Sequence, residues 1–473
     1  MQEARETLRV GDGRDVIITA LCEWRAVRRG EFPTKMYFLY SMLTAVGMAL
    51  LAPYYALRGL KRGKPFENFG ERMGYLPPGL GRGVAARTAI WVHAVSVGEV
   101  LAAKPLVEAM KKRFAGVPIF LSTTTVTGQQ VARERIAADA TFYFPFDWAA
   151  PVRRAFERIR PALVVILETE IWPNFLREAD RCDVPVVFVN SRISERSFAR
   201  FQRFEPFIGN FFRDALHKAD LFLAQSAEDA RRLVAMGAPE ERIEVTGNLK
   251  YDHEPPKQSA FGEWLAKEVA QQERWPVLVA GSIAAGEEEA VLAAYDVVQR
   301  QWRHALLILA PRKPDRFAGA AEIAEQDGWT VRRRSKMDMN AALDENCEVV
   351  ILDSIGELAG LYALADATFV GGSLVPVGGH NILESAWFCR APIFGPFMQN
   401  FREMAARFSS AGAGIQVASG EKLGKAWCEL IADPARRERM GEKARALVEA
   451  NRGATARSLE RISAVLEAQR GKL

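Results

Sequence analysis

The chain has 473 residues, of which 49% are hydrophobic and 26% are charged, with 63 Lys and Arg against 58 Asp and Glu. These fractions indicate a folded globular protein of two or three domains and exclude a largely disordered chain. The net charge of +5 is too small to indicate a nucleic-acid partner, but it is compatible with an acidic membrane surface or an anionic substrate. The five scattered cysteines form no CxxC pair, so they fit a reducing cytoplasm and predict neither a disulfide framework nor a zinc site.

The first predicted element is an uncharged apolar helix at 36–57, long enough to cross the hydrocarbon core of a bilayer. Aromatic residues lie at both of its ends, and the basic cluster at 58–64 that follows predicts that the rest of the chain faces the cytoplasm. A signal sequence and a buried core helix are the alternatives. Because no small-residue cleavage site follows, we expect an uncleaved membrane anchor, single-pass or monotopic, at the bacterial inner membrane. Residues 1–35 are polar and arginine-rich, and we expect a disordered extension or a mis-assigned start ahead of Met36.

After the anchor, short apolar runs alternate with amphipathic, charge-rich segments, which predicts an α/β fold. Continuous apolar runs, rather than alternating ones, are typical of parallel strands covered by helices on both faces. We therefore predict a doubly wound domain at 58–255. A polar, proline-bearing linker at 251–267 separates it from a second α/β domain, and we assign 256–473 to that domain. The first set of runs lies at 89–95, 117–123, 163–168, 184–190 and 221–225, and the second reads WPVLVAGS, HALLILAPR, CEVVILD and DATFVGGS.

A glycine-rich loop at 370–388 (VGGSLVPVGGHNILESAWF) follows the last of these strands and leads into a predicted helix. Its glycines allow backbone N–H groups to approach a ligand closely, and a helix N-terminus favours a phosphate. His380 and Asn381 stand at the predicted helix start, with Glu384 one turn further on. The alternative is a tight strand-to-helix turn whose glycines only relieve packing.

Two acidic positions follow predicted strands of the first domain. Glu99 ends the motif HAVSVGE and opens a helix, so it is either a general base or a first-turn acid favoured by the helix dipole. His93 lies so close to the strand end that a hydrogen-bonded core residue is the better interpretation. Glu168 and Glu170 end another strand, where side chains two residues apart point to the same side.

Basic side chains supply the complementary charge. Lys250 of TGNLKYD offsets negative charge on a departing phosphate or is an ordinary surface lysine. Arg312 of APRKPDRF lies beyond a strand at the carboxyl edge of the second sheet, where it can pair with a phosphate. In DSIGEL, Asp353 or Ser354 followed by Glu357 can cap a helix.

Together these motifs resemble the bacterial 3-deoxy-D-manno-octulosonic acid (Kdo) transferases of lipopolysaccharide biosynthesis. The resemblance rests on WVHAVSVGEV, ILETEIWPN, TGNLKYD, APRKPDRF, DSIGEL and FVGGSLVPVGGHNILE in the family's order, and on FGERMGY after the apolar segment. It implies a GT-B glycosyltransferase with two Rossmann-like domains facing a cleft. The implied reaction transfers Kdo from CMP-Kdo to the lipid A precursor (lipid IVA), with inversion and without a metal or other cofactor. A GT-B sugar-nucleotide epimerase and a membrane-tethered nucleotide-binding module are the alternatives.

The resemblance also implies roles for individual residues. It makes Glu99 the catalytic base, and it assigns Glu168 and Lys250 to stabilisation of the transition state. The N-terminal domain is expected to receive the lipid acceptor, and the C-terminal domain to hold the donor. The expected contacts with CMP are Pro311, Arg312, Ile355, Gly356, Glu357, Asn381, Ile382, Leu383 and Glu384.

Three positions depart from the family's pattern, and the segment 281–289 (GSIAAGEEE) also lacks an acidic residue that the pattern has. Ile382 stands where the family usually has proline, which restores an N–H donor at the helix start. Lys313 replaces histidine and keeps positive charge beside Arg312. Ile283 stands where a threonine is expected, and we expect the lost hydroxyl contact to affect donor affinity or sugar selectivity.

Overall fold

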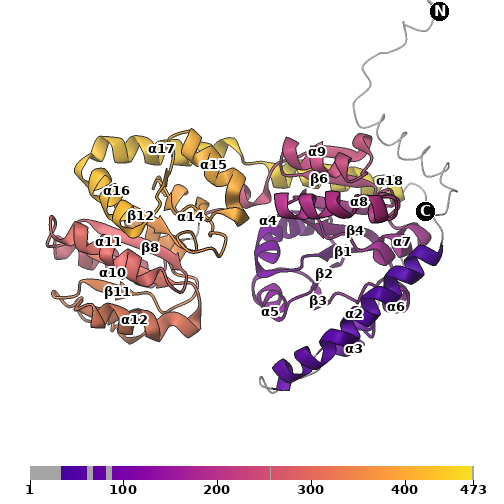
Figure 1. The fold of residues 1–473 in the computed structure, drawn as a ribbon, viewed down its shortest axis with the longest axis horizontal. Helices are drawn as coiled ribbons and strands as arrows, with labels where there is room; N and C mark the ends of the chain where they lie inside the picture. The colour runs from indigo at the N-terminus through magenta and orange to yellow at the C-terminus, as the bar shows by residue number, and fades with distance from the viewer. Residues whose placement is uncertain (1–33, 61–67, 81–87, 256, 471–473) are drawn as a thin grey trace, which may run out of the picture. The chain divides into compact units, whose positions relative to one another are not determined.

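The computed structural model describes residues 34–60, 68–80, 88–255 and 257–470, which form two compact units (Figure 1). The first unit comprises Met1–His253 and Arg452–Leu473, and the second comprises Glu254–Asn451. Most of the predicted N-terminal extension and of the basic cluster at 58–64 lies outside the described residues.

The first unit is built on a seven-stranded parallel sheet of order β3-β2-β1-β4-β5-β6-β7. Trp91 of β1 lies opposite Phe120 of β2 and Val164 of β4. The strands β1, β2, β4, β5 and β6 are buried along their whole length, which explains the continuous apolar runs. The strands are β1 (Ala89–His93), β2 (Ile119–Thr123), β3 (Ala140–Tyr143), β4 (Pro161–Leu167), β5 (Val186–Ser191), β6 (Leu221–Ala224) and β7 (Ile243–Val245).

Helices cover both faces of this sheet and divide its core into two clusters. One cluster centres on Trp91, whose ring contacts Phe142, Phe156 and Phe175. The helices are α2 (Thr34–Leu60), α3 (Phe69–Arg72), α4 (Val97–Arg113), α5 (Val126–Arg135), α6 (Ala149–Ile159), α7 (Pro173–Arg181), α8 (Glu195–Leu216) and α9 (Ala227–Ala235).

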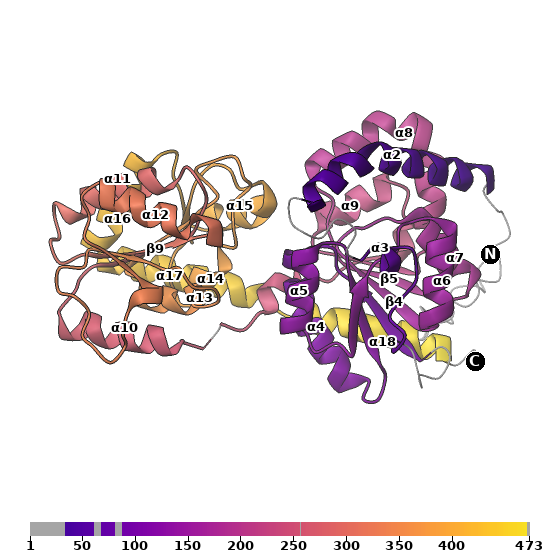
Figure 2. The same cartoon turned by 90° about the horizontal axis from the view of Figure 1, so that it is seen from below.

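The C-terminal helix α18 (Ala454–Arg470) also belongs to the first unit, where it lies beside α4 (Figure 2). Ile462 and Leu466 of α18 enter the same core cluster as Leu106 of α4. The carboxylate of Asp252 accepts hydrogen bonds from the N–H groups of Gly453 (2.6 Å) and Thr455 (2.5 Å) and so fixes the start of the helix. The structure therefore differs from the predicted domain boundary, which placed all of 256–473 in the second domain.

The second unit contains another seven-stranded parallel sheet, of order β10-β11-β9-β8-β12-β13-β14. Its strands are β8 (Val277–Ile283), β9 (Leu306–Pro311), β10 (Val331–Arg333), β11 (Val349–Ile351), β12 (Ala367–Val370), β13 (Ile393–Phe394) and β14 (Ile415–Gln416). Its α-helices are α10 (Ala260–Gln271), α11 (Glu288–Gln299), α12 (Phe317–Gln326), α13 (Leu358–Leu361), α14 (Leu383–Ala386), α15 (Arg402–Ser410), α16 (Gly420–Ala432) and α17 (Pro434–Ala450). Because α10 begins at Ala260, the segment between the units is shorter than the predicted linker.

The strand order reverses once in each sheet, which confirms the doubly wound α/β prediction. The reversal lies between β1 and β4 in the first unit and between β8 and β12 in the second. In open α/β sheets, ligands bind outside the carboxyl ends of the strands at this point. The residues that follow β1, β4, β8 and β12 are therefore the first candidates for a site.

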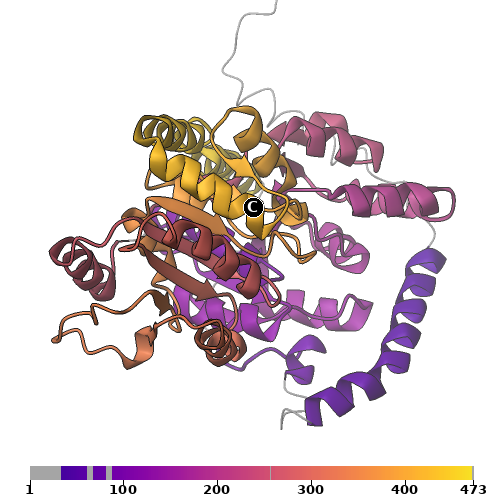
Figure 3. The ribbon, with the colours of Figure 1, turned by 60° about the vertical axis from the view of Figure 1, so that its left-hand side comes forward.

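The apolar helix α2 lies at the edge of the first unit (Figure 3). Hydrogen bonds along one side of the helix connect it to the rest of that unit. The Tyr37 hydroxyl donates to the Asp214 carboxylate (2.5 Å), the Asn174 side-chain amide donates to the Ser41 hydroxyl (3.0 Å), and the Trp148 ring N–H donates to the Thr44 hydroxyl (3.1 Å). Tyr37, Ser41 and Thr44 lie at helical spacing, so they form one stripe.

The opposite side of α2 is apolar and exposed. Among the described residues, Lys35–Ala52 is long and apolar enough to cross a membrane by length and composition, a test that core helices and signal sequences also pass. The exposed large side chains are Phe38, Leu39, Met42, Leu43, Val46, Leu50 and Leu51.

Candidate functional site

The first candidate site is built around Glu99 at the carboxyl end of β1. Ser96 precedes α4, and Glu99 lies in the first turn of that helix. The carboxylate accepts hydrogen bonds from the Val95 N–H and from the Ser96 hydroxyl, both at 2.8 Å. The sequence has the Ser-x-x-Glu spacing of a capping box, but the Ser96 side chain donates to Glu99 and caps no backbone N–H. Glu99 thus has the structural role of a first-turn acid, and that role also holds its carboxylate in one orientation.

The surroundings of Glu99 favour a proton-accepting role. Burial, and then the negative charge of Glu168, raise the pKa of Glu99 to about 7, against the two hydrogen bonds that lower it. A general base works best when its pKa is close to the operating pH. An ordinary exposed first-turn glutamate has no reason to titrate there.

Glu168 and Lys250 are brought together at the same edge of the sheet. Glu168 follows β4, and its carboxylate lies 3.7 Å from the Lys250 ammonium. Lys250 is held by its backbone, because the Asn248 side chain accepts from the Lys250 N–H (3.0 Å) and the Asn190 side chain accepts from the Leu249 N–H (3.0 Å). The three predicted catalytic residues therefore lie on one unit, with Glu168 influencing both of the others.

The expectation that strand geometry aligns Glu168 and Glu170 is wrong, because β4 ends at Leu167. Glu168 has a left-handed backbone (φ 56°), which breaks the alternation of a strand. The two carboxylates still interact, since burial and then the charge of Glu168 raise the pKa of Glu170.

His93 is a core residue, as predicted. It is fully buried, its Nδ1 lies 2.9 Å from the Ser122 hydroxyl, and its ring stacks on Phe144. Burial lowers the pKa of His93 to about 3, so the ring is neutral at physiological pH. His93 therefore supports the end of β1 and does not compete with Glu99 for a proton.

In the second unit, Arg312 follows β9. Its backbone N–H donates to the Ile283 carbonyl at the end of β8 (2.8 Å). The charge of Arg312 acts on two neighbours. Burial, and then Arg312, lower the pKa of His380 to about 4. Burial raises the pKa of Glu384 to about 7, while Asn381 and Arg312 oppose the rise. Arg312, His380 and Glu384 thus share one electrostatic neighbourhood, as expected of a donor site.

The segment 381–384 is arranged differently from the prediction. The helix α14 is short and begins at Leu383, after the predicted start at His380 and Asn381. The Asn381 side chain accepts from the Leu383 N–H (3.2 Å) and donates to the Glu384 carboxylate (3.4 Å). Ile382 and Leu383 are fully buried, so neither residue presents a surface to a ligand.

The DSIGEL loop is held by two arginines at the end of β10. Glu357 pairs with Arg334 (3.1 Å), and Asp353 pairs with Arg333 (2.9 Å). The capping arrangement considered from the sequence does not form, since no side chain caps α13. Ile355 is exposed and Gly356 has φ 96°, which leaves the tip of this predicted CMP-binding loop open.

A glutamate that the sequence analysis did not single out shapes the glycine-rich loop. Glu287 is fully buried, and its carboxylate accepts hydrogen bonds from the N–H groups of Gly372, Ser373 and Leu374. These amides are therefore engaged within the protein, contrary to the expectation that the loop offers them to a phosphate. The only signal was the acidic run at 287–289 after β8.

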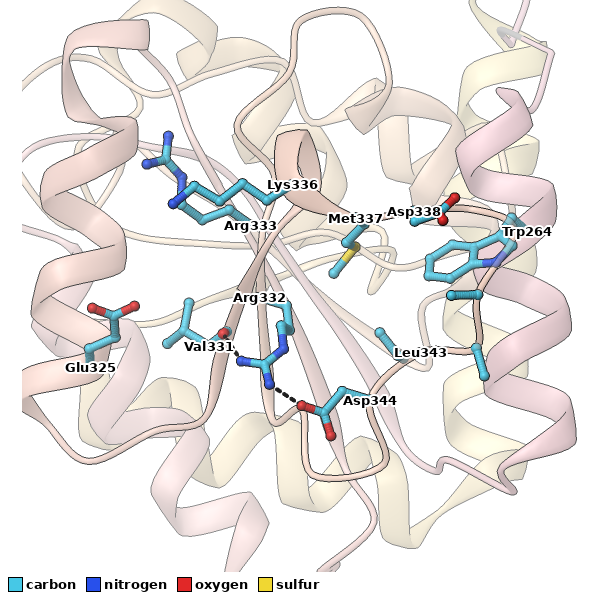
Figure 4. Close-up of a pocket in the computed structure, with 12 residues that line it drawn as sticks. Trp264, Glu325, Val331, Arg332, Arg333, Lys336, Met337, Asp338, Leu343 and Asp344 are labelled. Atoms are coloured by element: carbon cyan, nitrogen blue, oxygen red, sulfur yellow. Dashed lines mark hydrogen bonds and ion pairs between the residues drawn. The ribbon is translucent and has the colours of Figure 1, made fainter.

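A separate pocket of about 390 Å³ opens beside β10 (Figure 4). Its lining includes Trp264, Arg332, Met337 and Asp344, with Arg332 paired to Asp344. None of the residues predicted to bind CMP lines it. The pocket borders the DSIGEL loop through Arg333, which lines it and pairs with Asp353.

Comparison with known proteins decides the family. The family model for "3-Deoxy-D-manno-octulosonic-acid transferase (kdotransferase)" matches residues 67–253. The 3-deoxy-D-manno-octulosonic acid transferase of Haemophilus influenzae is 30% identical over 91% of this chain and 99% of its own length. The protein of the same description from Bordetella pertussis is 35% identical over 78% of this chain and 86% of its own length. The chain belongs to the Kdo transferase family.

Solved structures with the same fold include both transferases and epimerases. A glycosyltransferase from Rickettsia africae superposes with a TM-score of 0.54 at 12% identity, over 81% of this chain and 99% of its own. A UDP-N-acetylglucosamine 2-epimerase, so described for Listeria monocytogenes, gives 0.53 at 12% identity, over 82% and 98%. These similarities confirm the GT-B fold and nothing more. The sequence relatives, and not the fold, favour a Kdo transferase over an epimerase.

Proposed function

We propose that this Kdo transferase moves Kdo from CMP-Kdo to the lipid A precursor lipid IVA, with inversion and without a catalytic metal. The observation that carries the proposal is Glu99, a buried carboxylate with a pKa of about 7 where the first sheet reverses its strand order. Carboxylates whose pKa is shifted toward the operating pH cluster at active sites, and Glu99 also lies at the carboxyl end of a central strand, where a base can reach a substrate.

In the proposed step, Glu99 accepts the proton of the attacking hydroxyl of lipid IVA. The hydroxyl oxygen forms a bond to the anomeric carbon of Kdo as the bond from that carbon to the CMP phosphate oxygen breaks. The bond electrons leave with CMP, and one displacement inverts the configuration. Lys250, held near Glu168, offsets the negative charge of the reacting groups.

The donor is assigned to the second unit. Arg312 pairs with the CMP phosphate, because a guanidinium offers a planar fork of N–H donors to phosphate oxygens. Glu384 accepts from ribose hydroxyls, and Asn381, which donates to Glu384, keeps that carboxylate in place. Ile382 and Leu383, which are fully buried, hold the segment that carries Asn381 and Glu384. The remaining predicted contacts, Pro311, Ile355, Gly356 and Glu357, complete the assignment.

The test is transfer from CMP-Kdo to purified lipid IVA in detergent, followed by mass spectrometry. Glu99→Ala should abolish the mass gain, while Glu108→Ala, an exposed position on the same helix, should leave it intact. A sample treated with EDTA should retain full activity. No transfer by folded, CMP-binding wild-type protein would refute Kdo transfer, and loss of activity with EDTA would refute metal independence.

We also propose that the chain is a monotopic membrane protein with α2 lying in the interface. A membrane-spanning α2 would break the three polar contacts through Tyr37, Ser41 and Thr44, and groups left unpaired in hydrocarbon are costly. Its exposed apolar side resembles that of interfacial helices.

The neighbouring helix α8 supports the same arrangement. Phe211 of α8 packs on Tyr37 with ring centroids 5.0 Å apart, and Phe207 is 81% exposed. At helical spacing before Phe207 lies an exposed basic stripe, which suits anionic headgroups. The residues of the stripe are Arg196, Arg200 and Arg203.

Flotation with vesicles of phosphatidylethanolamine and phosphatidylglycerol tests this topology. Phe207→Asp should weaken binding strongly, whereas Val126→Asp, also at an exposed apolar position of the first unit, should not. Carbonate at pH 11 should extract the monotopic protein. Resistance to carbonate, together with unchanged binding of Phe207→Asp, would indicate a spanning helix instead.

A further inference from the structure

The carboxylate of Glu287 accepts four hydrogen bonds from backbone N–H groups, three of them in the glycine-rich loop of the second unit. One oxygen accepts from the N–H groups of Ala284 (2.8 Å) and Gly372 (2.6 Å). The other accepts from Ser373 (2.8 Å) and Leu374 (2.7 Å). Four charge-assisted hydrogen bonds on one buried carboxylate fix both the loop and the end of β8.

Successive backbone N–H groups form a concavity that binds anions in many phosphate sites. In this chain, the carboxylate of Glu287 occupies such a concavity formed by residues 372–374. The loop therefore contains its own anion, and the charge of the donor phosphate is left to Arg312. The role of Glu287 is to give the loop one shape.

A direct contact connects this loop to the predicted donor residues. The Gly372 carbonyl accepts from the Gly379 N–H (2.7 Å). Gly379 is two residues before Asn381, whose side chain bonds to Leu383 and to Glu384. The position of the loop thus determines where the segment 379–384 begins.

The packing around Glu287 leaves the loop little freedom. A Cβ atom on Gly371 would lie 2.7 Å from the Ser282 carbonyl oxygen and 2.8 Å from the Glu287 carboxylate. Gly372 has φ 66°, and a Cβ atom there would meet the His380 ring at 2.7 Å. The glycines therefore allow the carboxylate and the histidine to approach the backbone, which is a reason for them other than ligand contact.

We propose that Glu287 is a positioning residue for donor binding, which acts through Gly372 and Gly379 on Asn381 and Glu384. The inference rests on the proposed CMP-Kdo site. Glu287→Gln keeps the size of the side chain but turns an NH₂ group toward two backbone N–H donors. At least two of the four hydrogen bonds are then lost, so we expect the KM for CMP-Kdo to rise about tenfold or more, with the KM for lipid IVA unchanged.

The experiment compares Glu287→Gln and Glu287→Asp with Glu289→Gln, a matched change at an exposed position of the same helix. Hydrogen exchange of the peptide 371–376 in the absence of ligand reports whether the loop is released. Steady-state kinetics report the KM for each substrate and kcat, and calorimetry reports CMP affinity. The Asp variant, which keeps the charge but is shorter, should be intermediate and remains available if the Gln variant does not fold.

Faster exchange in Glu287→Gln with a raised donor KM, and with Glu289→Gln like wild type, is the expected result. Faster exchange with unchanged donor KM and CMP affinity would overturn the proposal and leave Glu287 a purely structural residue. Unchanged exchange in the loop would overturn it as well. Failure of the wild type to transfer Kdo is a different outcome that refutes the reaction, and CMP affinity then still decides the role of Glu287.

Discussion

Replacing Glu99 by glutamine should stabilise the protein at alkaline pH while it abolishes transfer. The pKa of Glu99 is raised from 4.5 to about 7 in the folded chain, so the folded state binds this proton more tightly than the unfolded state does. The resulting stabilisation is present below pH 4.5 and is lost as the pH rises through 7. Glutamine carries no charge, and its amide can accept from Val95 and donate to Ser96, so the local contacts of Glu99 are kept.

The size of the effect follows from the pKa change, since one pKa unit corresponds to roughly 1.4 kcal/mol. Ionised Glu99 therefore costs about 3 kcal/mol well above pH 7 and nothing at pH 4. For a unit of this size, each kcal/mol shifts the melting temperature by roughly 2–4 °C. Glu99→Gln should thus melt roughly 6–12 °C above wild type at pH 8 and close to wild type at pH 4.

Scanning calorimetry between pH 4 and 8.5 measures this difference, with Glu108→Gln as the exposed control on the same helix. The melting curves of wild type and Glu99→Gln should diverge progressively above about pH 5. An offset that is the same at every pH would mean that glutamine changes packing and not charge. A less stable variant at pH 8 would refute the argument that Glu99 is held in an unfavourable ionised state.

Three further predictions test other parts of the structure. Transfer should rise as the pH increases through about 7, because the base must be deprotonated, and pH profiles of kcat/KM should show Glu168→Gln shifting that rise to lower pH; identical profiles would exclude the charge coupling. Gly371→Ala should destabilise the second unit by about 1–3 kcal/mol in denaturant unfolding, because its Cβ meets backbone at 2.7 Å. Gly319→Ala, with nothing closer than 3.9 Å, should be neutral or stabilise by up to about 1 kcal/mol, and equal midpoints for the two would contradict the steric account. Asp252→Ala should speed hydrogen exchange at 453–456, and unchanged exchange would show that Asp252 does not hold α18.

The central strands could be predicted from sequence because each is buried on both faces. Along β1, β4 and β9 every residue is buried, so the apolar run is continuous and unmistakable. The strands β7 and β10 have three residues each and are partly exposed. Such short strands show no hydrophobic pattern that would identify them in the sequence. They form by pairing with β6 and β11, which is a tertiary effect.

The packing of α18 on the first unit could not be predicted from the sequence, because α18 follows the second unit along the chain. Its apolar residues, such as Ile462 and Leu466, suit any core of this type, and the polar linker at 251–267 is the one boundary that composition reveals. The return of the chain to the first unit depends on Asp252 and on core contacts more than 200 positions away in sequence. Local sequence patterns do not predict such contacts.

The acidic run at 287–289 shows why the donor side was only partly predictable. Glu287 is buried against four backbone amides, Glu288 is buried against Arg316 and the Gly286 N–H, and Glu289 is exposed. Three identical neighbours thus have three different environments, and no local rule distinguishes them. The consequence reaches the glycine-rich loop, whose glycines alone suggested a phosphate cradle. Because a protein carboxylate already fills that cradle, a bound phosphate there would face a negative charge, which is why the proposed donor site relies on the cation Arg312.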